Sequence, residues 1–195
     1  MKNVDLINKL NIYGSYSITG NSRYSSKLGK YYYTSTPYQT IAGVVRANVP
    51  NTELKAEKAH TMNVGFEASV WNNRINLGAA YYNINTTDVL MTGQRSSVLG
   101  TTTYYNNDGE ISSKGIELSL AVAPVYTKDF KWTIGGNLTT LDNKVESLGS
   151  LEKIISSVGE NAEVATMVGE SPYAFYGYKT QGVFATTEEA EKASL

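Results

Sequence analysis

The sequence predicts an all-β protein of the membrane-barrel kind, built as an antiparallel meander. Two observations support this fold class: apolar and polar residues alternate over segments of about ten residues, and the connections between these segments are alternately long and short. The clearest segment spans residues 61–70. One alternate set there is apolar (Met62, Val64, Phe66, Ala68, Val70), and the other is polar or glycine (Thr61, Asn63, Gly65, Glu67, Ser69). Because side chains alternate across a strand, this segment has one apolar and one polar face.

The same alternation recurs along the chain. The five segments that show it are 10–19, 61–70, 75–83, 114–123 and 130–139. Ten residues at about 3.4 Å each, tilted by about 40°, rise about 26 Å, which matches the ~25 Å apolar band of outer-membrane barrels. Each segment is therefore expected to be one membrane-spanning strand.

The connections between these strands predict their direction. Short turns are expected at 71–74 and 124–129, and long outer loops at about 20–60, at about 85–113 and from 141 onward. Outer-membrane barrels have short periplasmic turns and long extracellular loops. The first, third and fifth strands are thus expected to rise to the cell surface, and the other two to return from it.

Some structure is expected inside the long loops. Residues 41–46 and 176–184 read as further strands, 160–164 as a short strand or helix, and 186–195 as helix-prone. The run from Asn106 to Glu110 is rich in oxygen ligands, but it lacks the twelve-residue spacing with a terminal glutamate of a calcium-binding loop. Because Asp-Gly is a turn dipeptide, a plain turn is expected there.

Composition and charge exclude several classes of function. The 195-residue chain has a formal net charge of −1, no cysteine and one histidine, His60. No basic stripe predicts nucleic-acid binding, and no thiolate chemistry or multi-histidine metal site can be built. No paired carboxylates or phosphate-binding loop are recognisable. The sequence therefore predicts a protein that is not an enzyme, with no cofactor and no metal.

Three sets of side chains are candidates for function. Trp71 and Trp132 lie beside the two short turns and suit an interfacial aromatic belt, or alternatively the core of a soluble sheet. Glu67 and Glu117 lie on polar faces, so they are expected to point into the barrel lumen, for hydration, plug contact or substrate contact. Tyrosines in the long loops are expected either to contact substrate or a lid protein, or to pack within the loops: Tyr31, Tyr32, Tyr33, Tyr38, Tyr104 and Tyr105.

Six short motifs, in one order over nearly the whole chain, resemble SusC/RagA-like TonB-dependent transporters. They are 16–21 (YSITGN), 51–66 (NTELKAEKAHTMNVGF), 72–90, 109–118 (GEISSKGIEL), 128–132 (KDFKW) and 168–184 (VGESPYAFYGYKTQGVF). Ala56 replaces the usual tryptophan and Gln181 the usual aspartate. Neither departure touches a known chemical step.

This resemblance implies a partial segment, over 1–195, of a barrel of about 22 strands in the Gram-negative outer membrane. It implies a plug domain and further strands outside this chain, energy supplied through TonB, and a SusD-like surface lipoprotein as a lid. It also implies import of glycans or peptides. The alternative from the residues alone is a soluble all-β module that binds carbohydrate or acts as an adhesin.

Overall fold

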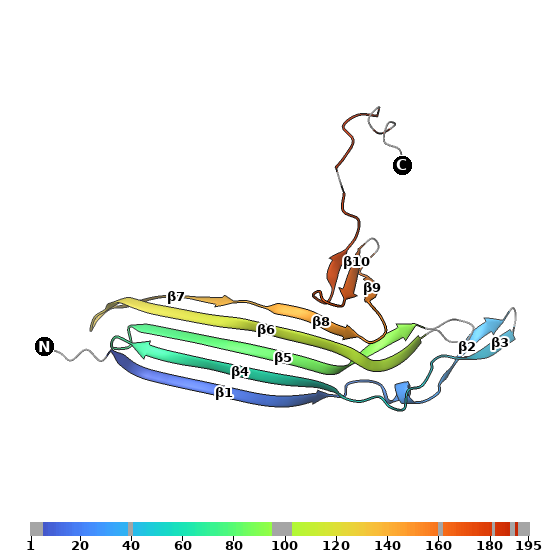
Figure 1. Ribbon diagram of the computed structural model, residues 1–195, viewed down its shortest axis with the longest axis horizontal. Coiled ribbons are helices and arrows are strands. Elements are labelled where there is room, and N and C mark those ends of the chain that lie inside the picture. The colour runs from blue at the N-terminus through green and yellow to red at the C-terminus, as the bar shows by residue number, and fades with distance from the viewer. Residues whose placement is uncertain are drawn as a thin grey trace.

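A six-stranded antiparallel sheet dominates the computed structural model, which describes residues 6–38, 41–94, 103–159, 162–180, 182–187 and 190. Its strands are β1 (Ile7–Asn21), β4 (Glu57–Val70), β5 (Ile75–Gln94), β6 (Thr103–Tyr126), β7 (Lys131–Thr139) and β8 (Asp142–Leu148). They pair in the order β1-β4-β5-β6-β7, and β8 continues the line of β7 along β6 (Figure 1). The predicted antiparallel meander is confirmed.

The register separates the two faces of the sheet along its whole width. One row places Leu10, Ala68, Leu77, Leu120 and Gly136 opposite one another, and the next row places Asn11, Glu67, Gly78, Ser119 and Asn137 opposite one another. The predicted alternation is thus in phase on all five strands. The apolar face is open: Ile12 is 72% exposed and Leu138 59% exposed. A face this apolar and this exposed needs lipid or another apolar surface against it.

Both short connections lie at one end of the sheet, which we call the turn end (residues 71–74 and 127–130; Figure 1). Asn72 and Asn73 adopt left-handed backbone angles, with φ of 54° and 59°, as the adjacent asparagines predicted. In the other turn, Thr127 Oγ1 accepts from the Phe130 amide at 3.0 Å. The turn begins after Tyr126 rather than at 124, because β6 continues past Pro124 through a register shift.

The opposite end, which we call the extended end, corrects the prediction of a long loop at 85–113. β5 runs to Gln94 and β6 begins at Thr103, so the two strands are 20 and 24 residues long. The predicted turn at Asp108-Gly109 is also wrong, because both residues lie inside β6. Two register shifts near Val89 bend the pair while it stays hydrogen-bonded.

The segment expected as a loop over 20–60 carries more structure than predicted. A 3-10 helix (η1, Ser26–Gly29) is followed by a hairpin of β2 (Tyr33–Tyr38) and β3 (Ile41–Arg46), which confirms the strand expected at 41–46. β4 starts at Glu57, four positions before the predicted strand. The hairpin projects past the main sheet at the extended end (Figure 1).

The region after 141 is also not a plain loop. β8 pairs with β6, and a three-stranded sheet follows: β9 (Lys153–Ser157), β10 (Glu163–Met167) and β11 (Ala174–Tyr176). A small core of Met91, Val145 and Leu148 lies beneath it. The strand predicted at 176–184 is wrong, since β11 ends at Tyr176. The helix expected at 186–195 falls largely outside the described residues.

Tyrosine rings lie over glycines on the facing strand at three places. The pairs are Tyr13 over Gly65, Tyr82 over Gly115, and Tyr104 over Gly93, and each pair is directly opposite in register. A Cβ atom at any of these glycines would collide with the facing ring. The large tyrosine content is therefore partly structural, because an aromatic ring covers the gap that a strand glycine leaves.

Helices contribute little to this fold. None of the helical residues that the structure describes belongs to a segment long and apolar enough to cross a membrane.

Candidate functional site

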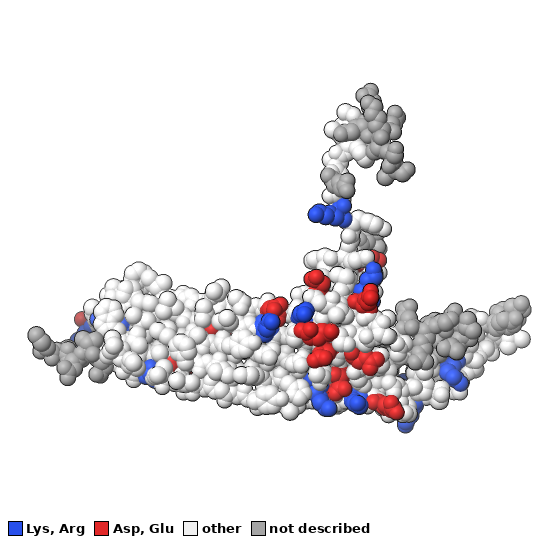
Figure 2. Space-filling view, viewed as in Figure 1, with Lys and Arg blue, Asp and Glu red and all other residues white. Residues whose placement is uncertain are grey.

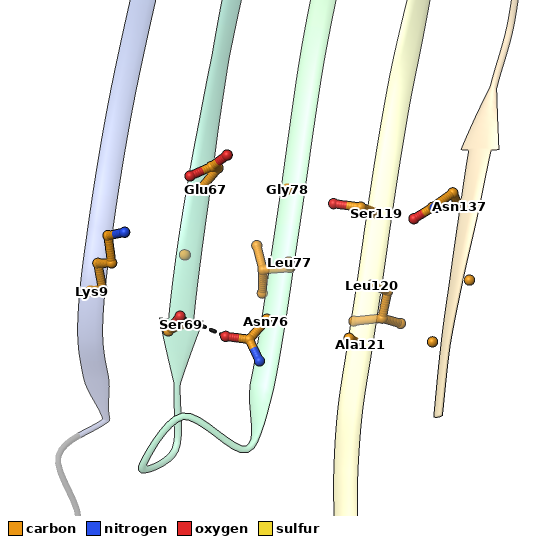
Figure 3. A pocket seen from close by; sticks show the side chains of 13 residues that line it. Lys9, Glu67, Ser69, Asn76, Leu77, Gly78, Ser119, Leu120, Ala121 and Asn137 are labelled. Carbon is orange, nitrogen blue, oxygen red and sulfur yellow. Dashed lines mark hydrogen bonds between the residues drawn. The ribbon is translucent and has the colours of Figure 1, made fainter. Parts of the chain in front are cut away.

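The polar face of the main sheet carries a shallow hollow near the turn end, in which side chains from all five paired strands meet (Figure 3). Lys9 comes from β1, Glu67 from β4, and Asn137 from β7. Between them, Ser69 Oγ donates to Asn76 Oδ1 at 2.6 Å. The hollow therefore presents two charges of opposite sign and several neutral hydrogen-bonding groups.

Glu67 and Glu117 lie on this same face and line one continuous depression. Only β5 separates their strands, and it places the small residues Gly78 and Ala80 opposite the two glutamates. Sequence spacing alone could not show that Glu67 and Glu117, fifty positions apart, lie close together. The strand register shows it. Among the described residues, no group of three histidine, cysteine or acidic side chains is arranged to hold a metal ion. This face is a polar wall suited to hydration and reversible contact.

The candidate tyrosines divide into two structural settings at the extended end. Tyr31 and Tyr33 are about 60% exposed beside the projecting hairpin, and the Arg46 guanidinium lies 4.7 Å from the Tyr31 ring centroid. Tyr104 and Tyr105 are half-buried in β6. Tyr32 is exposed, and Tyr38 ends β2, although its side chain is outside the described set. The exposed group is thus the one available to a partner.

Three asparagines hold these outer segments together, a role that the sequence pattern does not predict. Asn48 is buried; its Oδ1 accepts from the Tyr32 amide at 3.2 Å and its Nδ2 donates to the Lys30 carbonyl at 2.9 Å. Asn51 Nδ2 donates to the Tyr105 carbonyl at 3.0 Å. Asn107 Nδ2 donates to the Asp88 carbonyl at 2.7 Å, and its Oδ1 accepts from the Lys55 amide. Each side-chain amide thus bonds to backbone groups of another segment.

Charged residues cross the apolar side of the sheet at its extended end. We call this set the charged band: Lys58, Asp88, Lys114, Asp142, Lys144 and Glu146. Three ion pairs join its members, Lys58–Asp88, Lys114–Asp142 and Lys144–Glu146, each at 3.5 Å. Figure 2 shows charges gathered across the sheet toward this end and sparse along the rest of it. The charged band therefore marks where the apolar surface of the sheet ends, on the side of the extended end.

The carboxyl of Glu146 in this band has a lowered pKa. The Ser112 hydroxyl, which donates to Glu146 Oε1 at 2.7 Å, lowers the pKa of that carboxyl below its usual value, and the ammonium groups of Lys144 and Lys114 lower it further. Since the pKa is lower in the folded protein, this contact stabilises the fold above the unfolded-state pKa. The stabilisation is lost as the pH falls through the folded-state pKa.

Trp71 and Trp132 lie at the turn end, and each is 51% exposed. Trp132 is on β7 opposite Val125, and Trp71 opens the β4–β5 turn with the Arg74 guanidinium 5.8 Å from its ring. Both flank the apolar rows on the side away from the charged band. Tryptophan at this level is typical of the lipid–water boundary.

We expect lipid to reach both tryptophans near its headgroups. In the full-length protein reconstituted in brominated lipids, bromine close to the headgroup should quench Trp71 and Trp132 fluorescence more than bromine at the chain ends. The signal of each residue is isolated by subtracting the spectra of Trp71→Phe and Trp132→Phe variants. Equal quenching by both lipids would contradict an interfacial position.

Comparison with known proteins agrees with this geometry. The family described as "TonB dependent receptor-like, beta-barrel" matches residues 3–166. TonB-dependent receptor P3 of Formosa agariphila is 30% identical over 179 residues, which covers 87% of this chain and 18% of the relative. TonB-dependent receptor SusC of Bacteroides thetaiotaomicron is 28% identical, covering 92% of this chain and 20% of SusC.

A solved structure gives the same result for the fold. The structure of the RagAB peptide transporter superposes with a TM-score of 0.72 at 24% identity, over 89% of this chain and 19% of the matched chain. The chain spans about a fifth of the length of the curated relatives that it matches. The strands thus correspond to part of a larger barrel wall. This chain belongs to the TonB-dependent receptor-like β-barrel family, as a SusC/RagA-like segment of an outer-membrane barrel.

Proposed function

We propose that the whole protein imports a glycan or peptide across the outer membrane, driven through TonB, and that this segment supplies wall strands and outer loops. The observation that carries the proposal is the five-strand register, with a continuous apolar face on one side and a continuous polar face on the other. A wall of this kind separates lipid from a hydrated lumen. Two comparisons support TonB-driven import: RagAB is named a peptide transporter, and the similar curated proteins are named TonB-dependent receptors.

In this proposal the extended end faces the cell exterior and the turn end faces the periplasm. Long extensions outside and short turns inside are the usual asymmetry of outer-membrane barrels. Glu67 and Glu117 then point into the lumen, with Glu67 nearer the turn end than Glu117. We assign them to lumen hydration or contact with a plug domain, because their hollow is shallow and the residues opposite them on β5, Gly78 and Ala80, are small.

The projecting hairpin β2–β3 is proposed to contact a SusD-like surface lipoprotein, with the nearby Tyr31, Tyr32 and Tyr33 in the same contact. Ile41 and Val44 on β3 are each more than 70% exposed. An isolated two-stranded hairpin is only marginally stable in water, so a partner surface would stabilise it. Tyr104 and Tyr105 are proposed to support this region or to contact substrate from β6.

Removing the hairpin tests this assignment in the full-length protein. The Ala47 amide donates to the Tyr32 carbonyl at 3.0 Å, so the base of the hairpin is already closed and residues 33–46 can be replaced by a short turn. We expect the barrel to assemble, while lipoprotein co-purification and uptake of a labelled substrate fall at least about tenfold, equivalent to about 1.4 kcal/mol.

The control replaces the β4–β5 turn residue Trp71 by phenylalanine, at the other end of the sheet. Uptake should be measured with defined oligosaccharides and defined peptides, with and without TonB. TonB-independent uptake would contradict the transport proposal. Unchanged lipoprotein binding by the hairpin variant would contradict only the assignment of the hairpin.

A further inference from the structure

A pocket of about 280 Å³ lies at the extended end, between the main sheet and the small sheet β9–β11. The main sheet contributes Met91 from β5, Ile111 from β6 and Leu148 from β8, and the small sheet contributes Ile154 from β9 and Thr166 from β10. Pockets that enclose a whole small-molecule ligand are larger, at roughly 300–1,000 Å³. This pocket therefore has the size for one large side chain or one sugar ring.

The pocket lies on the polar side of the main sheet, which the proposed function assigns to the lumen. Ile111 and Glu117 are an even number of positions apart on β6, and the pairing of β5 with β6 has no register shift between them, so their side chains share a face. Val145 is opposite Ile111 on β8 and is fully buried. A ligand that enters the lumen from the extended end therefore meets this pocket before it meets Glu117.

The lining of the pocket suits an apolar group better than a sugar. Its apolar residues outnumber its polar ones, and none of the described residues that line it is charged. Two of its hydroxyl groups already have partners: Ser147 Oγ donates to the Asp108 carbonyl at 3.2 Å, and Thr166 Oγ1 accepts from the Tyr173 amide at 3.3 Å. A sugar ring buried here would leave some of its hydroxyls without partners, which is costly, whereas an apolar side chain would only leave water.

Tyr173 lies at the rim of the pocket, because it lines the pocket and is also 72% exposed. Its backbone is strained: the φ of 58° is a left-handed value that a bulky residue rarely adopts. The hydrogen bond from its amide to Thr166 holds this conformation. Backbone strain of this kind clusters at ligand-binding sites, so the rim has the character of a built site.

An open strand edge adjoins the pocket. β9 is the last strand in the order β11-β10-β9, so one of its edges has no strand partner in the part of the chain that the structure describes. Ile154 and Ser156, which alternate with outward-facing neighbours on β9, both line the pocket. An extended peptide can add to such an edge through main-chain hydrogen bonds while one of its side chains occupies a neighbouring pocket. A glycan has no peptide backbone that could continue the ladder.

We propose that this pocket binds one large apolar side chain of a peptide whose backbone pairs with β9. The inference rests on the transport function proposed above and deepens it, because it selects a peptide rather than a glycan as the class of substrate. Three observations support it together: the apolar lining, the strained residue at the rim and the open edge of β9.

Affinity for defined peptides tests this choice in the full-length protein purified in detergent. The probes are short synthetic peptides that differ only in the central residue, which is leucine, phenylalanine, serine or aspartate, and a neutral oligoglucose of similar length. Isothermal titration calorimetry measures the dissociation constants. We expect the leucine and phenylalanine peptides to bind at least about tenfold more tightly than the serine and aspartate peptides.

A substitution that fills the pocket should remove this preference. Ser156→Phe places a ring in the pocket from an exposed position on β9, so the leucine peptide should then bind no better than the serine peptide. Ser157→Phe is the matched control, because it makes the same change at the next residue, on the other face of the strand. The control should keep the preference. Heat-dependent mobility on a gel verifies that each variant is folded.

Several results would overturn the proposal. They are equal affinity for all the peptides, an equal effect of the two substitutions, and binding of the oligoglucose that Ser156→Phe abolishes. Absence of binding by every peptide would overturn it as well, since the pocket would then have another occupant. Binding in detergent requires neither TonB nor a membrane, so failure here is distinguishable from failure of the transport proposal, which the uptake assay decides.

Discussion

Gly115→Ala is expected to lower the free energy of unfolding of the full-length barrel by about 3 kcal/mol, because the new methyl group would meet a backbone atom that cannot move aside. A Cβ atom at Gly115 would overlap the Thr140 carbonyl oxygen and the Tyr82 hydroxyl. Tyr82 donates to that carbonyl at 3.0 Å, across the point where β7 gives way to β8. The substitution would thus separate the β7–β8 line from β6.

Urea unfolding followed by gel mobility or tryptophan fluorescence measures this loss. Gly136→Ala is the matched control, because a Cβ atom at Gly136 meets nothing within 4 Å. Alanine there should change stability by less than about 1 kcal/mol, since it fills open space on a strand that tolerates a side chain. Equal stability of the two variants would show that the Tyr82–Gly115–Thr140 contact does not hold the strands together.

Leu120→Arg is expected to destabilise the membrane-inserted barrel by about 2–4 kcal/mol, the range observed for arginine on the lipid face near the bilayer midplane. Leu120 lies in the middle of the apolar rows, opposite Leu77 and Gly136, and is half exposed. An arginine there would have to keep its charge in hydrocarbon or bend out of it. Unfolding in lipid vesicles measures the effect.

Ser119→Arg makes the same change one residue earlier, on the polar face. A long charged side chain there should be tolerated, because Ser119 lines the open hollow beside Glu67 and Asn137. We expect its unfolding free energy to stay within about 1 kcal/mol of wild type. If Ser119→Arg were the more harmful of the pair, the assignment of lipid and lumen faces would be inverted.

Much of the main sheet could be predicted because each spanning strand separates two different environments. Residues 61–70 must be apolar on alternate positions, and this pattern fixes the strand, its faces and its phase with β1 and β5. The asparagine pair at 72–73 likewise predicts the turn, since left-handed backbone angles are a local property. Trp71 and Trp132 could be placed at one end of the sheet because each lies beside one of the two short turns.

The extended end could not be predicted in this way. Residues 85–94 and 103–113 lack the alternation that marks a strand between lipid and water, since their apolar residues are few and Val89, Leu90 and Met91 follow one another directly. They are strands because β5 and β6 are already paired and the ladder of hydrogen bonds continues outward. The dipeptide Asp108-Gly109 then lies opposite β8 instead of forming a turn.

The candidate surfaces show the same division. Glu67 and Glu117 were each placed on a polar face by parity, but their shared hollow depends on how far β4 and β6 are shifted along β5. Within the charged band, the Lys58–Asp88 pair depends on the left-handed φ of Asp88, and the Lys114–Asp142 pair depends on the pairing of β8 with β6. The sequence by itself determined the amphipathic strands, their faces and the family. Only the pairing of strands decided three other features: the strand length beyond the membrane, the tyrosine–glycine contacts and the charged band. The physical reason is that register places residues from distant parts of the sequence opposite one another, and no local pattern predicts which residues these are.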